Sequence, residues 1–396
     1  MIGQEWIGPD YRLGKLEPQM IFVSRHFYPD LNGIGKYATE YVKWWSETLD
    51  EPVHIIVPNS EAFTRTSALS NIFTLFSISR RQTRNKILEE ATELAFGLLI
   101  VGRLLFSKTF YAERTIFLVS PPAIFGLPLL ILARLCGKRT VYLIQDLESS
   151  LVALFPAFKL LSKLVGKLES LCVACATRVI VINPDMKKSL PGIDGVCCIY
   201  NFADDFAFEL KDLKSVSPEI IYSGNFGKKV DFSLIRQAVT ILGLSVKWRL
   251  IGGGRSERRV RETFGRLKNV KIEPFLSEES FRQLLKDDHI HIIPQTRGIS
   301  TAVLPSKIHN LFAAGARIVG TGDSGTFFES IMNSGGIFVP AGDVEYFCAS
   351  LRIALEKYPD EKRKFAQRFA AENFSREKNL SALTTCVKGR DSGIGV

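Results

Sequence analysis

Short apolar runs alternate with amphipathic stretches along most of the chain. Strands rich in Val, Ile and Leu that alternate with helices are typical of a parallel sheet covered on both faces. The pattern therefore predicts an α/β protein. The predicted strands are Ile21–Ser24, Val53–Val57, Thr115–Val119, Thr140–Ile144, Val179–Ile182, Val196–Tyr200, Ile220–Ser223, Lys247–Ile251, Val270–Glu273, Ile290–Ile293, Arg317–Gly320 and Gly336–Val339.

These strands are too many for one parallel sheet of ordinary size, so we expect two doubly wound domains. A polar, acidic stretch at residues 201–217 separates an N-terminal domain, 20–205, from a C-terminal domain, 206–360. Because this stretch holds no Pro/Gly-rich linker, we expect the domains to touch across a cleft. Residues 1–19 are predicted to be an N-terminal extension, and residues 361–396 to form helices that cross back to the N-terminal domain.

One uncharged stretch, residues 115–133, reaches the length of a membrane-spanning helix. Three prolines and a glycine fall inside it, and they interrupt a continuous helix. We therefore predict a strand at Thr115–Ser120, a turn, and a buried helix at Ala123–Leu135, with a spanning helix as the alternative.

The chain carries a formal net charge of +10, which favours an anionic partner such as a nucleotide, a nucleic acid or an acidic membrane surface. Lys and Arg are spread along the chain without a nucleic-acid-binding motif, so we expect no nucleic-acid partner. Seven irregularly spaced cysteines do not suit a secreted disulfide framework. Since no signal peptide opens the chain, we expect a cytoplasmic protein.

Ligands of open parallel sheets bind at the carboxyl ends of the strands. Gly33 and Gly35 follow the first strand at a helix start, where backbone N–H groups can face an anion; a tight turn is the alternative. Asp146 follows the strand at 140–144, where its carboxylate can orient a hydroxyl, act as a base or cap the next helix.

Two segments of the C-terminal domain combine small residues with lysines. Asn225, Lys228 and Lys229 lie in GNFGKK after a strand, a composition that suits a diphosphate or a solvated turn. In LPSKIHNLFAAG, Ser306 and Lys307 open a helix and can offer an anion a hydroxyl, free N–H groups and a cation. A capped helix that only packs is the alternative.

A further stretch, residues 157–167, has an apolar face and three lysines at a spacing of four. These are Lys159, Lys163 and Lys167. Such a helix can lie on an anionic membrane, and packing against its own domain is the alternative.

The motifs form an ordered set: FYPDLNGIGKY, LIQDLES, VINPDM, YNFADD, YSGNFGKK, LPSKIHNLFAAG with GTGDSGT, and PAGD. Over roughly residues 20–360 the set resembles bacterial family-4 glycosyltransferases of the GT-B architecture, in particular those of colanic-acid-type exopolysaccharide and O-antigen (lipopolysaccharide) assembly. The resemblance implies two Rossmann-like domains that face a cleft. The C-terminal domain would hold a nucleotide-sugar donor of UDP or GDP, and the acceptor would approach the N-terminal domain.

The resemblance also implies roles for individual residues. Lys228 or Lys229 matches the lysine that binds the donor diphosphate, and Phe275 and Leu276 match a loop that holds the base through backbone groups. The donor-binding set is Gly33, Gly35, Asn225, Lys228, Lys229, Phe275, Leu276, Ser306, Lys307 and Asn310. We predict catalytic roles for Asp146, Lys228 and Lys307.

Several positions depart from the family's pattern. Asn310 and Ala302 stand where family members often carry two glutamates, and Asn310 can bond a ribose hydroxyl only without charge assistance. Asn225 replaces an arginine of the phosphate loop, and Gln145-Asp146 stand where a histidine is common.

The implied activity is transfer of a hexosyl group to a lipid-linked or polysaccharide acceptor, by a peripheral enzyme at the cytoplasmic face of the membrane. Family members mostly retain the anomeric configuration. The departing diphosphate can then take the acceptor's proton while lysines stabilise its charge, so no protein base, metal or bound cofactor is expected. The alternatives are a nucleotide-sugar epimerase of the same architecture and a degenerate, non-catalytic transferase-like scaffold.

Overall fold

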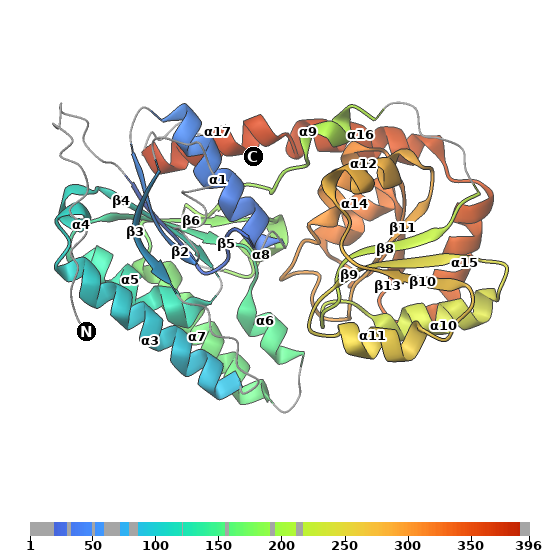
Figure 1. Cartoon of the computed structure of the whole chain (residues 1–396), viewed down its shortest axis with the longest axis horizontal. Helices are drawn as coiled ribbons and strands as arrows, with labels where there is room; N and C mark the ends of the chain where they lie inside the picture. Colours follow the sequence, from blue (N-terminus) through green and yellow to red (C-terminus); the bar gives the residue numbers. More distant parts are fainter. Residues whose placement is uncertain are drawn as a thin grey trace.

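The computed structural model describes residues 20–29, 33–49, 52–58, 72–78, 86–120, 122–154, 158–190, 195–210 and 217–388. Within them the chain forms two parallel sheets, each covered by helices on both faces (Figure 1). In both sheets the first strand lies between the second and the fourth, the order typical of doubly wound folds. The predicted fold class is confirmed, whereas the predicted extension at 1–19 lies outside the described residues.

The N-terminal domain is built on a sheet in the order β3-β2-β1-β4-β5-β6-β7. Helices α3, α5 and α7 cover one face of it, and α1 and α17 cover the other (Figure 1). Its strands are β1 (Met20–Ser24), β2 (Val53–Pro58), β3 (Ile72–Ile78), β4 (Thr115–Ser120), β5 (Arg139–Ile144), β6 (Arg178–Val181) and β7 (Cys197–Cys198). Its helices are α1 (Ile34–Thr48), α3 (Lys86–Leu105), α4 (Lys108–Ala112), α5 (Ala123–Leu135), α6 (Glu148–Ala153), α7 (Lys159–Cys175) and α8 (Pro184–Lys188). The short helix α9 (Asp205–Phe208) follows in the segment between the domains and packs against helices of the C-terminal domain.

The C-terminal domain is built on a sheet in the order β10-β9-β8-β11-β12-β13. Its strands are β8 (Ile220–Asn225), β9 (Trp248–Gly253), β10 (Val270–Glu273), β11 (Ile290–Pro294), β12 (Arg317–Gly322) and β13 (Ile337–Pro340). The helices that follow β8 are α10 (Phe232–Leu242), α11 (Glu257–Phe264), α12 (Glu278–Lys286), α13 (Lys307–Ala313), α14 (Phe327–Gly335), α15 (Val344–Glu356), α16 (Asp360–Asn373) and α17 (Arg376–Lys388).

Central strands are apolar throughout because helices bury both of their faces. All residues of β1 and β4 are buried. On one face, Phe117 lies 4.9 Å from Trp45 of α1, measured between ring centres. On the other face, Gly126 of α5 packs so closely that a Cβ there would stand 2.6 Å from Leu118 Cδ2. Both sides of the sheet are therefore packed core.

The apolar runs locate most strands to within two residues at each end. Strand β3 was not predicted. The uncharged stretch at 115–133 forms β4 and α5 at the predicted bounds. Across the described residues, we find no helix with both the length and the apolar character needed to cross a bilayer.

The last two helices join the domains at the top of the molecule (Figure 1). Helix α16 packs against α13 and α14 of the C-terminal domain. Helix α17 packs against α1, where Thr384 Oγ1 accepts hydrogen bonds from the indoles of Trp44 and Trp45 at 3.2 and 3.0 Å. The chain thus returns to the domain in which it began.

Candidate functional site

A cavity of about 1970 Å³ lies between the two domains, at the carboxyl ends of both sheets. Residues that end or follow strands line both of its walls: Arg25 and Asp146 on the N-terminal side, Asn225 and Gly254 on the C-terminal side. This is where open parallel sheets bind ligands. We call the two sides the N wall and the C wall.

The predicted site residues meet in this cavity with one exception. Its lining includes Gly33, Asp146, Asn225, Lys228, Lys229, Phe275, Leu276, Ser306, Lys307 and Asn310. Gly35 is instead buried inside α1, where its carbonyl accepts a hydrogen bond from Thr39 Oγ1 at 2.8 Å. Gly33 directly precedes α1 with a φ of 51°, a conformation that favours glycine.

Glycines allow the ends of β8 and β9 to pack closely behind the C wall. A Cβ on Gly252, whose φ is +146°, would stand 1.9 Å from the carbonyl oxygen of Gly224. A Cβ on Gly254 would stand 2.0 Å from Asn225 Oδ1. The ends of β8 and β9 therefore approach so closely that only glycine fits at these two positions.

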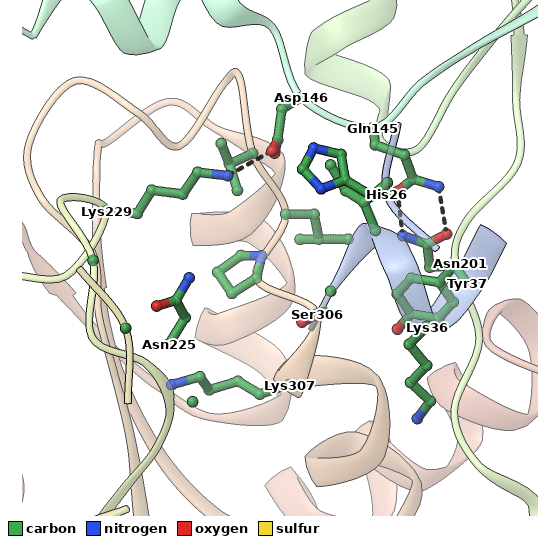
Figure 2. A pocket seen from close by; sticks show the side chains of 18 of the residues that line it. His26, Lys36, Tyr37, Gln145, Asp146, Asn201, Asn225, Lys229, Ser306 and Lys307 are labelled. Atoms are coloured by element: carbon green, nitrogen blue, oxygen red, sulfur yellow. Dashed lines mark hydrogen bonds and ion pairs between the residues drawn. The ribbon is translucent and has the colours of Figure 1, made fainter. Parts of the chain in front are cut away.

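Lys307 points its ammonium at this wall from the start of α13 (Figure 2). The Nζ lies 3.7 Å from the centre of the Tyr222 ring. No carboxylate of the described residues forms an ion pair with Lys307, and burial lowers its pKa to about 7. An anion bound beside Nζ would favour the charged form, so the site suits a phosphate group.

The loop after β8 carries the other two predicted lysines. Thr296 fixes its backbone, because its N–H donates to the carbonyl of Lys229 at 3.1 Å and its hydroxyl to that of Lys228 at 2.9 Å. The Lys229 Nζ forms an ion pair with Asp146 Oδ2 at 2.6 Å across the cleft (Figure 2). The predicted diphosphate lysine and the predicted carboxylate are thus partners.

Asn310 is occupied by a contact between the domains. Its amide donates to Asp204 Oδ2 at 2.7 Å and accepts from the Asp204 N–H at 2.8 Å, while Lys36 Nζ lies 2.6 Å from the same carboxylate. Ala302, at the other departure from the family pattern, is fully buried, and its carbonyl accepts from the N–H of Leu147 at 3.3 Å. These bonds leave Asn310 one further amide N–H, and the residue still lines the cavity that a ribose would enter.

Gln145 supports the N wall through hydrogen bonds inside the N-terminal domain. The buried side chain exchanges hydrogen bonds with Asn201, at 2.8 and 3.2 Å (Figure 2), and it also donates to the hydroxyl of Tyr41 at 3.0 Å. With all of these bonds made inside the domain, Gln145 fixes the end of β5. The residue that β5 presents to the cleft is therefore Asp146.

Sequence reasoning missed two residues that directly follow β1. Arg25, only 3% exposed, pairs with Glu93 through both Nε and Nη2 at 2.5 Å and lies over the ring of Phe125 at 5.5 Å. His26 projects into the cavity (Figure 2). Both are basic side chains at the carboxyl end of a strand, and this position alone could have identified them. The sequence analysis singled out only the glycines farther along the same loop.

Comparisons with known proteins agree with this architecture. No family model matches the chain. A relative from Escherichia coli strain K12, WcaI, assigned to colanic acid biosynthesis as a glycosyl transferase, is 25% identical over 387 residues, covering 87% of this chain and 94% of the relative. Sucrose-phosphate synthase from Thermosynechococcus elongatus has a TM-score of 0.74 at 14% identity, covering 94% of this chain and 98% of that one. HepE of Anabaena, solved with UDP-glucose, has a TM-score of 0.66 at 12% identity, covering 94% and 100%.

The resemblance predicted from the motifs is confirmed by these likenesses. The fold is that of the GT-B glycosyltransferases, and the chain is similar to a glycosyl transferase of polysaccharide synthesis over most of its length. The predicted enzyme class is confirmed with it.

Proposed function

We propose that the protein transfers a hexosyl group from a nucleoside-diphosphate sugar to a lipid-linked or polysaccharide acceptor in bacterial surface polysaccharide synthesis. The observation that carries this proposal is the C wall, where Lys307 lies beside Gly224 at the end of β8, without a carboxylate partner among the described residues. The UDP-glucose bound to HepE and the colanic acid assignment of WcaI support the donor class and the product class.

In the proposed reaction the acceptor hydroxyl oxygen bonds to the anomeric carbon while the bond from that carbon to the diphosphate breaks. Both events occur on one face of the sugar, so the anomeric configuration is retained. The departing phosphate oxygen takes the acceptor's proton, and Lys307 and Lys228 stabilise the charge that develops on it. The lysines supply the charge that a metal would otherwise supply, and Asp146 orients the acceptor hydroxyl.

The first test is thermal stability with UDP, GDP, CMP, dTDP and NAD in parallel. A ligand at 100 times its Kd should stabilise the protein by about 2.7 kcal/mol. One diphosphate should stand out, and transfer from the matching sugar donor should persist in EDTA with retention at the anomeric carbon. Change of the sugar without acceptor would indicate an epimerase, and inversion or loss of transfer in EDTA would refute the mechanism.

An exposed apolar surface with lysines beside it supports the proposed lipid-linked acceptor. Helices α3, α5 and α7 form the outer layer of the N-terminal domain (Figure 1). Large apolar side chains on and next to this layer are exposed: Leu98, Leu99, Phe106, Ile131, Leu135, Leu160, Leu164 and Leu171. The exposed Lys159, Lys163 and Lys167 share α7 with three of them. Apolar side chains flanked by lysines fit the surface of an anionic bilayer.

Helix α6 connects this surface with the cleft. It packs along α7, and its Leu151 and Val152 line the cavity on the N-terminal side. An acceptor whose lipid lies in the bilayer would thus meet apolar contacts up to the cleft. We infer peripheral association with the inner face of the membrane.

Liposome flotation tests this association. Changing Lys159, Lys163 and Lys167 to Glu should abolish binding to anionic vesicles, because the opposite charge is then repelled. The matched control changes three exposed lysines of the C-terminal domain, Lys247, Lys268 and Lys357, to Glu. Equal loss in both variants, or none in the first, would refute a specific surface.

One observation favours a second candidate, a non-catalytic scaffold. Both positions that carry glutamates in the family, 302 and 310, here bond the two domains to each other. A scaffold would bind UDP or GDP without transferring or hydrolysing the sugar of any donor tested. Turnover above that of Lys307→Ala would exclude it.

A further inference from the structure

The ion pair between Lys229 and Asp146 links two domains across the proposed donor site. The residues are 83 positions apart in sequence, line the same cavity and approach to 2.6 Å. This ion pair brings a negative side chain of the N wall to a lysine of the proposed diphosphate site. The question is therefore what happens to this pair when a diphosphate enters.

Asp146 is the fixed member of the pair. Its neighbour Gln145 is bonded inside the N-terminal domain, and the N–H of its other neighbour, Leu147, donates to Ala302 of the C-terminal domain. The carboxylate itself is 13% exposed. Residues on both sides therefore hold it in the cleft.

Lys229 is the movable member. Its backbone is fixed through Thr296, but its side chain is 41% exposed and makes its ion pair only at the tip. Such a partly exposed pair contributes little energy, about 0.2–1 kcal/mol. A diphosphate carries more negative charge than one carboxylate, so it would compete successfully for the ammonium.

We propose that Asp146 is a displaceable counterion: it holds Lys229 inside the cleft until the donor's diphosphate takes its place, and the released carboxylate then faces the acceptor. This inference rests on the proposed function, because it requires a diphosphate donor. It assigns Asp146 a role in donor entry that is separate from its contact with acceptor.

Isothermal titration of the full chain with UDP and with GDP tests the competition. Asp146→Asn should bind the diphosphate about two- to fivefold more tightly, since Lys229 no longer has a rival anion. In steady-state transfer the same variant should lower both KM for the donor and kcat. A merely structural role would not give tighter binding together with slower turnover.

Asp205→Asn is the matched control, because Asp205 is another carboxylate that lines the cavity. It removes the same charge and should leave the affinity near that of the wild type. In a Lys229→Ala background, Asp146→Asn should no longer change the affinity. Thermal unfolding of each variant verifies that it is folded.

Unchanged or weaker binding by Asp146→Asn, an equal gain in Asp205→Asn, or a gain that persists without Lys229 would overturn the counterion. Each of these results would leave the proposed function intact, since the wild type would still bind the diphosphate. Failure of the wild type to bind either UDP or GDP would instead overturn both proposals.

Discussion

The two walls of the cleft differ in whether their cationic side chains have carboxylate partners in the same domain. On the N wall, buried or half-buried cations are matched by carboxylates of the same domain, as in Arg25 with Glu93 and Lys36 with Asp204. On the C wall, Lys307 faces an aromatic ring, and the described residues supply no carboxylate for it. These two cations of the N wall are thus already neutralised, whereas Lys307 of the C wall gains most from an added anion. Breaking a matched pair of the N wall should mainly change stability, and removing the C-wall cation should mainly change binding and transfer.

The largest effect is expected where a buried pair of the N wall is broken. Glu93→Gln leaves the guanidinium of Arg25 buried without its charge partner, which should lower the free energy of unfolding by about 3–5 kcal/mol. Chemical denaturation measures this change. Below the unfolding transition, the affinity for the nucleotide should stay within twofold of the wild type.

The control for this prediction removes both charges. Arg25→Met combined with Glu93→Leu leaves no unpaired ion, so it should recover much of the lost stability. If Glu93→Gln were fully stable but bound the nucleotide poorly, the pair would belong to the binding site and the contrast between the walls would fail.

The next effect is the loss of the cation of the C wall. Lys307→Ala should reduce kcat/KM for sugar transfer by about 10²–10³-fold, because one group that stabilises leaving-group charge is removed. Stability should not fall, since a buried ammonium without a carboxylate partner is costly to the folded state. Lys357→Ala, an exposed lysine of the same domain, is the control and should retain full activity.

The contrast between the walls shows how far sequence reasoning reaches. Apolar runs predicted most of the strands. The rule for parallel sheets placed Asp146, Asn225 and Lys307 at one cleft, because the carboxyl ends of parallel strands lie together however far apart the strands are in sequence. Strand β3 escaped detection because Thr74 and Ser77 interrupt its apolar pattern at the edge of the sheet.

The partners within the site could not be predicted in the same way. Asn310, which is predicted to bond a ribose, also bonds Asp204, a residue 106 positions away in the sequence, and this partner was not predicted. Such contacts depend on how the two domains dock, and neither periodicity nor local spacing encodes that. The matched charges of the N wall are therefore a finding of the structure.

A smaller effect should follow from adding a side chain to a glycine of β9 behind the C wall. Gly252→Ala places a methyl group 1.9 Å from the carbonyl oxygen of Gly224, so the ends of β8 and β9 must separate. We expect a loss of about 1–3 kcal/mol in stability and weaker nucleotide binding, measured by denaturation and titration calorimetry.

Gly102→Ala on helix α3 is the control. No atom lies within 4 Å of the added Cβ, so this substitution should stabilise the protein by about 0.5–1 kcal/mol. Equal binding by Gly252→Ala would show that the wall tolerates movement.

The smallest effect concerns pH. Burial lowers the pKa of Lys307 to about 7, so in the free protein its side chain is mostly neutral at pH 8 and mostly charged at pH 6. A bound diphosphate favours the charged form and raises this pKa, so binding at pH 8 should take up a proton and binding at pH 6 should not. The affinity should fall above pH 7, by at most about tenfold per pH unit.

Titration calorimetry in HEPES and in Tris at pH 8 measures this proton uptake, because the two buffers have different heats of ionisation. Lys307→Met should remove this uptake while keeping that of the nucleotide itself. Identical uptake in both proteins would mean that Lys307 does not change its protonation on binding, and the proposed link between its pKa and the affinity would then fail.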